Sequence, residues 1–238
     1  MKICGAQTRS EAGNIPKNIH EHIRMIRLAF EHGADSVFFP ELSITGYEPS
    51  LCSHLATIKE DARFLPFQEL SNSQGIIIGM GVPLQAETGT TISMLIFQPG
   101  KSVEVYSKKY LHDDEIPFFV PGENSFSLLP IALAICYEIS IPGHAAAASA
   151  MHAGYYVACV AKSKTGMQKA YAQLSLVAKN YGMPVMIVNS LGPSDNFIAC
   201  GKSAVWNRDG ELLTKAGNRE GLIFFDSESE AAQFIETE

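Results

Sequence analysis

Positive charge is scarce in this chain of 238 residues, because 18 Lys and Arg stand against 25 Asp and Glu and give a formal net charge of −7. Binding to a phosphate backbone needs Lys and Arg gathered on one face or along one helix. The pairs Lys108-Lys109 and Lys162/Lys164 are too small and too far apart in the chain to form such a patch. We therefore expect no nucleic-acid partner.

Long apolar runs are also lacking. The longest fully apolar run, Leu128 to Cys136, is far shorter than the roughly 20 residues that a membrane-spanning helix needs. The start, MKICGAQTRS, lacks the apolar region and the small-residue cleavage site of a secretory signal. These absences predict a cytoplasmic protein with no membrane partner.

Cysteines are few, and their number is odd. The five positions show no short metal-type spacing: Cys4, Cys52, Cys136, Cys159 and Cys200. This pattern signals neither a disulfide framework nor a zinc site. We expect free thiols, with Cys4 and Cys159 in the core and Cys52 and Cys200 in loops.

The apolar residues that are present follow helix and strand periodicities. A helical stripe runs from Ile15 to His32, with Pro16 at its start and Gly33 after its end. Short apolar segments predict buried strands at 36–40, 75–84, 91–98, 102–108, 130–136, 155–161 and 184–190. Two more helices are predicted at 144–153 and 167–181, and a hairpin at 203–215.

This order of elements interleaves helices with hairpins, whereas a doubly wound parallel sheet would alternate strand and helix strictly. It predicts an α/β fold of the four-layer α-β-β-α sandwich type. No linker is visible, so residues 1–238 are expected to form one domain. The acidic tail, 225–238, is expected to be mobile or to contact a partner chain.

Cys136 stands at the end of an apolar strand and before a Pro142-Gly143 break. Such a position exposes a side chain at a sheet edge, where backbone N–H groups can face a developing oxyanion. A free cysteine is also a common small core residue. As a nucleophile the thiol needs a base. His144 and His112 are candidates, which leaves a Cys/His hydrolase open.

Two other predicted strands end in a chemically active side chain. Glu41 follows the apolar strand in VFFPEL, where desolvation would raise its pKa toward the range useful for proton transfer. Lys108 closes the strand in VEVYSK, and a fixed ammonium can stabilise an oxyanion. Taken alone, each residue is more often simply a solvated charge at a strand end.

Together the three segments resemble one family. FFPELSITGY, YSKKYL and AICYEISIP resemble the glutamate, lysine and cysteine motifs of the nitrilase superfamily of carbon-nitrogen hydrolases, in the same order. The resemblance continues through PFFVPGE and from NYGMPVMIVNSLG to FIACGKSAVWNRDGELL. It implies the α-β-β-α sandwich of the nitrilase / carbon-nitrogen hydrolase type, a homodimer or higher homo-oligomer, and chemistry without a metal or cofactor.

The resemblance also implies a role for each matching residue. Cys136 would attack an amide, carbamoyl or nitrile carbon and form a thioester, with Glu41 as the general base. Lys108 and the backbone N–H of Tyr137 would hold the oxyanion. Glu115 would orient Lys108 and the substrate or the hydrolytic water. Hydrolysis of an amide or carbamoyl group to an acid and ammonia is the leading expectation, and nitrile hydrolysis is the alternative.

The expected pocket residues are Tyr47, His112, Glu138 and Asn189. Acidic residues here, including Asp113 and Asp114, would favour an amine-bearing substrate.

Three features depart from the family pattern: Tyr110 replaces the usual histidine of the lysine motif, Gly143 replaces a carboxylate, and the segment 161–168 is short. The last two leave open a non-catalytic scaffold with a binding role.

Overall fold

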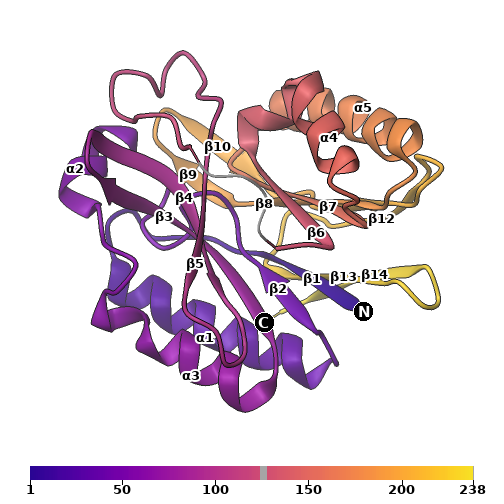
Figure 1. Ribbon diagram of the computed structural model, residues 1–238, viewed down its shortest axis with the longest axis horizontal. Helices are drawn as coiled ribbons and strands as arrows, with labels where there is room; N and C mark the ends of the chain where they lie inside the picture. Colours follow the sequence, from indigo (N-terminus) through magenta and orange to yellow (C-terminus); the bar gives the residue numbers. More distant parts are fainter. Residues whose placement is uncertain (124–127, 238) are drawn as a thin grey trace.

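Two β-sheets lie face to face between two layers of helices (Figure 1). The computed structural model describes residues 1–123 and 128–237. Helices α1 and α3 cover the seven-stranded sheet, and helices α4 and α5 cover the five-stranded sheet. The predicted α-β-β-α sandwich is thereby confirmed.

The larger sheet has the strand order β14-β13-β1-β2-β3-β4-β5. Its strands are β1 (Lys2–Gln7), β2 (Ser36–Phe38), β3 (Ile77–Ala86), β4 (Gly89–Phe97), β5 (Glu104–Ser107), β13 (Gly221–Asp226) and β14 (Ala231–Glu236). Strands β1, β2 and β3 run parallel, and the other neighbours pair antiparallel. The sheet is mixed, and the predicted meander forms its β3-β4-β5 edge.

The smaller sheet has the order β12-β11-β8-β7-β6, with the central parallel strands β6, β7 and β8. Its strands are β6 (Ile131–Ile135), β7 (Tyr155–Val160), β8 (Val185–Asn189), β11 (Ala204–Trp206) and β12 (Leu212–Lys215). A separate two-stranded ribbon consists of β9 (Leu191–Ser194) and β10 (Phe197–Cys200).

The α-helices are α1 (Ile15–Glu31), α2 (Cys52–Leu55), α3 (Leu65–Gln74), α4 (Pro142–Ala150) and α5 (Lys164–Tyr181). Short 3-10 helices are η1 (Pro49–Leu51), η2 (Ala62–Phe64) and η3 (Cys136–Ser140). Helix α1 ends as its sequence predicts, because Gly33 takes a positive φ of 76° and its N–H bonds to the Phe30 carbonyl.

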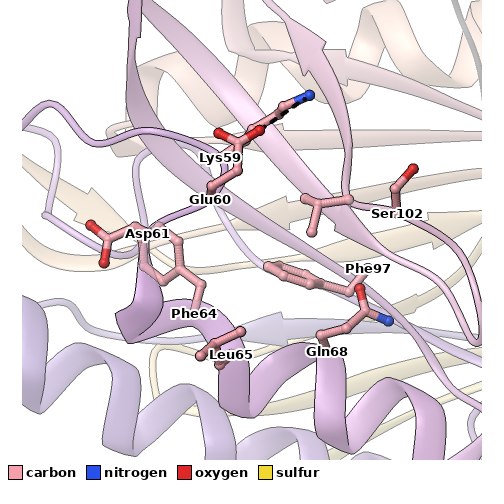
Figure 2. A pocket seen from close by; sticks show the side chains of 9 residues that line it. Lys59, Glu60, Asp61, Phe64, Leu65, Gln68, Phe97 and Ser102 are labelled. Atoms are coloured by element: carbon pink, nitrogen blue, oxygen red, sulfur yellow. Dashed lines mark ion pairs between the residues drawn. The ribbon is translucent and has the colours of Figure 1, made fainter.

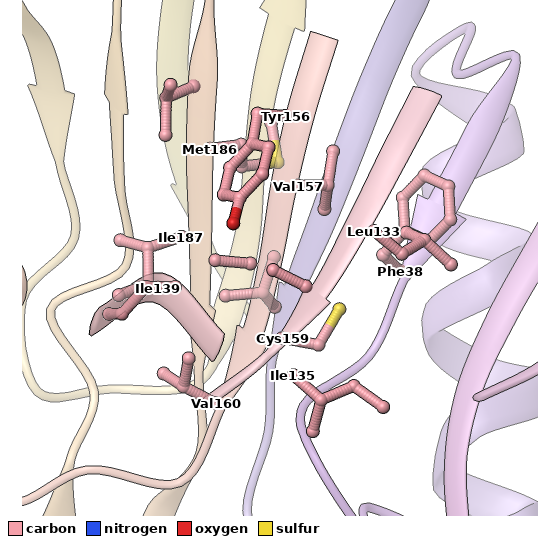
Figure 3. Packing of buried hydrophobic residues seen from close by; sticks show 14 of the residues in the cluster. Phe38, Leu133, Ile135, Ile139, Tyr156, Val157, Cys159, Val160, Met186 and Ile187 are labelled. Carbon is pink, nitrogen blue, oxygen red and sulfur yellow. The ribbon is translucent and has the colours of Figure 1, made fainter. Parts of the chain in front are cut away.

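Alternation along the strands distributes the core between the layers. In β13, Leu222 and Phe224 pack in the cluster beneath α1 and α3, whereas Ile223 and Phe225 belong to the other cluster. Successive side chains of a strand point to opposite faces, so a strand buried on both faces is a continuous apolar run. Figure 3 shows part of the second cluster, which joins the two sheets.

Several predicted details need correction. Helices α4 and α5 begin at Pro142 and Lys164, earlier than expected, because Pro is favoured in a first helical turn and Ser163 caps α5 through its side chain. Within the acidic tail, Ala231–Glu236 form the edge strand β14, which was not predicted. Glu238 lies outside the described residues.

All five cysteines are free thiols. Cys4 and Cys159 are fully buried in strands, as predicted. Cys52 is instead a buried residue of helix α2, and Cys200 ends strand β10. Within residues 1–123 and 128–237, no helix has the length and apolar character needed to cross a membrane.

Candidate active site

Three chain segments bring Glu41, Lys108 and Cys136 into one region of the molecule. Glu41 follows β2 and Lys108 follows β5, both in the seven-stranded sheet, whereas Cys136 directly follows β6 in the five-stranded sheet. Their closeness is a tertiary result, because the face-to-face packing of two sheets brings together strand ends that are far apart in the chain.

The turn that carries Glu41 lies directly against strand β3. The N–H of Ile44 donates to the Gly81 carbonyl oxygen at 3.0 Å, and Leu42 takes a positive φ of 51°. A Cβ added at Gly81 would lie 2.4 Å from both the Leu42 nitrogen and the Pro40 oxygen. Only glycine permits so close an approach between the two backbones.

A buried histidine of helix α1 holds the same turn from its other side. His22 stacks on Phe39 with ring centroids 4.0 Å apart, and its Nδ1 lies 2.7 Å from the Asn18 carbonyl oxygen. Nδ1 therefore carries the hydrogen, and Nε2 accepts from the Ser43 hydroxyl at 2.9 Å. Burial lowers the pKa of His22 to about 3, so the ring is neutral at pH 7.

Lys108 is fully buried between two carboxylates. Its Nζ lies 2.7 Å from Glu41 Oε1 and 2.6 Å from Glu115 Oε1. Glu115 also accepts hydrogen bonds from the Tyr47 hydroxyl and the His112 N–H. Burial opposes the charge of Lys108, but the adjacent carboxylates raise its pKa above the ordinary value. The ammonium therefore stays charged at pH 7.

Glu41 keeps one oxygen out of this ion pair. Its Oε2 is buried and has no hydrogen-bond partner among the described residues. Burial raises the pKa of Glu41, against the lowering effects of Lys108 and of the neighbouring Cys136 thiol. A carboxyl group with a raised pKa and an unused oxygen is suited to accept and return a proton.

Cys136 has an unusual backbone conformation at the start of η3. Its φ is +43°, a left-handed value that is uncommon for residues other than glycine. The half-buried sulfur lies 3.9 Å from the Ala161 carbonyl oxygen. Tyr137 follows in the first turn of η3, where helical N–H groups have no acceptor within the helix.

The pKa of Cys136 is raised to about 11, first by burial and then by the Glu41 carboxylate, while Lys162 and Lys108 lower it. The thiol is therefore protonated at pH 7. A base next to it is needed if it is to act as a nucleophile.

A cavity of about 230 Å³ opens over these groups. It is lined by Tyr47, His112, Asp114, Glu115, Cys136, Tyr137, Ala161, Lys162, Ser163, Gly166 and Phe197. Two of the four predicted pocket residues, Tyr47 and His112, lie in this wall. The cavity also contains Lys162 and Phe197, which periodicity did not indicate because both stand in loops or at an element start.

Glu138, predicted as a pocket residue, is instead a buried brace. Its Oε2 accepts from the Ile135 N–H at 2.8 Å and the Tyr106 hydroxyl at 2.7 Å, and Oε1 accepts from the Lys109 N–H at 2.7 Å. One carboxylate thus joins the backbone before Cys136 to the backbone after Lys108. A Cβ added at Gly143 would meet nothing within 4 Å. The carboxylate that braces this loop is therefore that of Glu138, not one at position 143.

Asn189 is likewise not part of the cavity wall. Its fully buried amide accepts from the Lys162 N–H at 2.8 Å and donates to the Lys162 carbonyl oxygen at 3.0 Å. It therefore fixes the main chain of a residue that does line the cavity. Sequence patterns do not distinguish this role from direct contact with a ligand.

The two candidate histidines differ in position. His144 is buried, and both ring nitrogens bond to tyrosine hydroxyls, Nε2 to Tyr106 and Nδ1 to Tyr156, each at 2.8 Å. His112 is exposed at the cavity, where its Nδ1 lies 2.6 Å from Asp114. The charges of the Glu41 and Glu115 carboxylates raise the pKa of the thiol, Glu41 more strongly, and neither imidazole contributes to that shift.

A second cavity, of about 280 Å³, lies beside helix α3 and holds none of the predicted site residues. Figure 2 shows its apolar floor, which includes Phe64 and Phe97, and the Lys59–Glu60 ion pair at its rim. Lacking a buried nucleophile or acid, it offers no comparable chemistry. The described residues also contain no group of three His, Cys, Asp or Glu side chains able to hold a metal ion.

The four-layer sandwich and a cavity that holds a thiol are features of nitrilase-superfamily hydrolases. Residues 3–235 match the carbon-nitrogen hydrolase family, and the chain belongs to that family.

Among solved structures, the NitN amidase from Nesterenkonia sp. AN1 is similar, with a TM-score of 0.84 and 25% identity over 95% of this chain and 92% of that one. A cysteine-to-alanine mutant of the same amidase in complex with butyramide aligns with a TM-score of 0.85 at 24% identity, covering 97% of this chain and 92% of that one.

Two glutamine-dependent NAD(+) synthetases are also similar in sequence. The one from Thermotoga maritima is 25% identical over 90% of this chain and 39% of its own length, and the one from Acinetobacter baylyi is 26% identical over 98% and 45%. The chain thus spans less than half of these relatives. The nitrilase homolog 2 of Dictyostelium discoideum is 23% identical over 95% of this chain and 74% of its own length.

Proposed function

We propose that the protein hydrolyses the carbon-nitrogen bond of an amide or carbamoyl group to an acid and ammonia, through a thioester on Cys136. The observation that carries the proposal is the position of the Lys108 ammonium, bonded to both Glu41 and Glu115 beside the cavity that holds the thiol. A buried base, a fixed cation and a nucleophile are the groups that acyl transfer needs.

Each step of this reaction has a group with suitable chemistry. Glu41 takes the thiol proton, and the sulfur of Cys136 attacks the carbonyl carbon. The oxygen becomes negatively charged and is held by Lys108 and the N–H of Tyr137. As the tetrahedral intermediate collapses, the carbon-nitrogen bond breaks and Glu41 returns its proton to the departing ammonia.

Water then completes the cycle. Glu41 removes a proton from a water molecule that attacks the thioester, and Glu115 orients that water and Lys108. The carbon-sulfur bond breaks, the acid leaves, and the thiol regains its proton. The cycle needs no redox step and no co-reactant other than water.

The comparisons support amides as the substrate class. The Nesterenkonia amidase has been solved in complex with butyramide, and the similar synthetases are glutamine-dependent. An ammonia-release assay on butyramide, glutamine and simple nitriles tests the proposal. Ammonia from amides, an acyl-sized mass increase on Cys136, and the loss of both in Cys136→Ala with an unchanged circular dichroism spectrum are the expected results.

Other outcomes separate the alternatives. Full activity in Cys136→Ala would refute the thioester route. Turnover of nitriles alone would assign nitrile hydrolysis to the same site. An intact protein without turnover or adduct would favour a non-catalytic scaffold. If His144→Ala or His112→Ala damaged activity as much as Cys136→Ala while Glu41→Gln were mild, a Cys/His mechanism would replace this one.

A further inference from the structure

Lys162 is a cavity residue that the proposed reaction does not use. It follows strand β7, is half-buried, and lines the same cavity as Cys136. In the part of the chain that the structure describes, every ion pair involves other residues, so the Lys162 ammonium has no carboxylate partner. An ammonium in a cavity wall without a carboxylate partner can bind a negatively charged group of a ligand.

The main chain of Lys162 is held firmly. Its N–H and carbonyl groups both bond to the buried Asn189 amide, and the carbonyl oxygen also accepts from the Cys200 N–H at 3.1 Å. Its aliphatic stem passes beside Gly166, where an added Cβ would lie 3.3 Å from the Lys162 Cβ. The side chain therefore starts from a fixed point at the cavity wall, as a specificity residue requires.

The other charged side chains of the cavity wall already have partners. Glu115 is bonded to Lys108, and Asp114 lies 2.6 Å from His112 Nδ1. The field of Lys162 also reaches the reacting sulfur, because its charge lowers the pKa of Cys136. An anionic group on a bound substrate would thus meet an unpaired ammonium close to the nucleophile.

We propose that Lys162 binds a carboxylate of the substrate and thereby selects amides that carry a carboxylate a few carbons from the amide group. This inference rests on the proposed amide hydrolysis and names its substrate class. Lys162 is a specificity residue in this scheme, and Asn189 is a positioning residue that acts through it.

The first test compares succinamate with butyramide, which have the same four-carbon skeleton and differ by a carboxylate in place of a methyl group. The ratio of their kcat/KM values is measured for the wild type, for Lys162→Met, and for Lys164→Met as a control on the exposed surface of α5. We expect the wild type to favour succinamate by about ten- to a hundredfold, the effect of one charge-assisted hydrogen bond.

Lys162→Met should remove most of that preference, and Lys164→Met should retain it. An unchanged ratio in Lys162→Met would overturn the inference, even if both rates fell together, because a general effect on the thiol cancels in the ratio. A wild type that prefers 4-aminobutyramide to succinamate would also overturn it and would support an amine-binding role for Asp114.

A second test does not depend on turnover. Iodoacetate and iodoacetamide both alkylate the sulfur of Cys136 with loss of iodide, but only iodoacetate is an anion. The rate with iodoacetate is divided by the rate with iodoacetamide, both measured at pH 8 by mass spectrometry of the Cys136 peptide. This ratio should fall several-fold in Lys162→Met and not in Lys164→Met. If none of succinamate, butyramide and glutamine is hydrolysed, the proposed function fails. If amides are hydrolysed but both ratios are the same in the wild type and in Lys162→Met, only the present inference fails.

Discussion

The Nζ atom of Lys108 lies 2.7 Å from Oε1 of Glu41, with both side chains fully buried. Burial of this pair, together with Glu115, removes three charged groups from water, which is costly unless each is paired. The cluster has two carboxylates and one ammonium, so it keeps one excess negative charge when all three are ionised. Burial is the main cause of the raised pKa of Glu41, and the charge of Glu115 adds to it against the opposing charge of Lys108.

Lys108→Met should destabilise the protein as well as inactivate it. Without the ammonium, Glu41 and Glu115 face each other in a buried site, and breaking such a pair costs about 3–5 kcal/mol. Urea unfolding measures this change in the free energy of unfolding. The neighbouring Lys109→Met is the control, and we expect it to change stability by less than about 0.5 kcal/mol. Equal stability of the two variants would contradict the role assigned to the buried cluster.

Glu41→Gln should lower the rate of ammonia release by about 10²–10⁴-fold, the usual contribution of a general base. In the wild type, the acid limb of the kcat/KM profile should lie above the usual carboxyl range, because the pKa of Glu41 is raised and only its ionised form accepts a proton. Stopped assays between pH 4 and pH 9 measure both effects. A fully active Glu41→Gln variant would exclude Glu41 as the base.

The rate of iodoacetamide alkylation of Cys136 should keep rising above pH 9. With a pKa of about 11, the thiolate fraction increases roughly tenfold for each pH unit from 7 to 10. An unperturbed thiol, with a pKa of about 8.5, would level off near pH 9. Mass spectrometry of the Cys136 peptide follows the rate. A plateau near pH 9 would show that the thiol is not perturbed in this way.

Gly81→Ala should disturb the Glu41 turn, because the added Cβ would lie 2.4 Å from backbone atoms of Pro40 and Leu42. Misplacement of a reacting group by about 1 Å can cost 10²-fold in rate, and overpacking about 1–3 kcal/mol in stability. Gly143→Ala is the matched control, since its Cβ meets nothing within 4 Å and alanine favours the helix by up to about 1 kcal/mol. Comparable activity losses in both variants would refute a specific role for Gly81.

Glu138→Gln tests the brace between Lys109 and Ile135. Burial alone would raise the pKa of Glu138, but hydrogen bonding and charge from His144 and the Tyr106 hydroxyl lower it overall. A lowered carboxyl pKa contributes stability above the unfolded value of about 4.3 and loses it as pH falls through the folded value. We expect the variant to be about 1–3 kcal/mol less stable at pH 7.

This difference between the wild type and Glu138→Gln should shrink as the pH falls below about 4, where the wild-type carboxyl also becomes protonated. Thermal or urea unfolding at several pH values measures it. A difference that stays constant from pH 7 to pH 3 would show that the charge of Glu138 plays no part.

The layer arrangement and the chemically active residues at the strand ends could be predicted from the sequence. Apolar segments bounded by turn residues marked most of the strands, and Glu41, Lys108 and Cys136 each stand directly after such a segment. Local patterns carry this information because strand burial and termination depend on neighbouring residues. Strands β9, β10, β13 and β14 have no counterpart among the predicted segments. Strand β14 lacks the apolar run of a buried strand because its residues are polar and partly exposed.

Only the tertiary structure decided which side chains face the cavity. Glu138 bonds to a backbone group 29 positions away and Asn189 to one 27 positions away, so their orientation depends on contacts that no local period records. The sequence by itself determined a sandwich whose strands end in an acid, a cation and a thiol. Packing of the two sheets decided that the acid and the cation pair in a buried site next to the thiol, because burial forces opposite charges together.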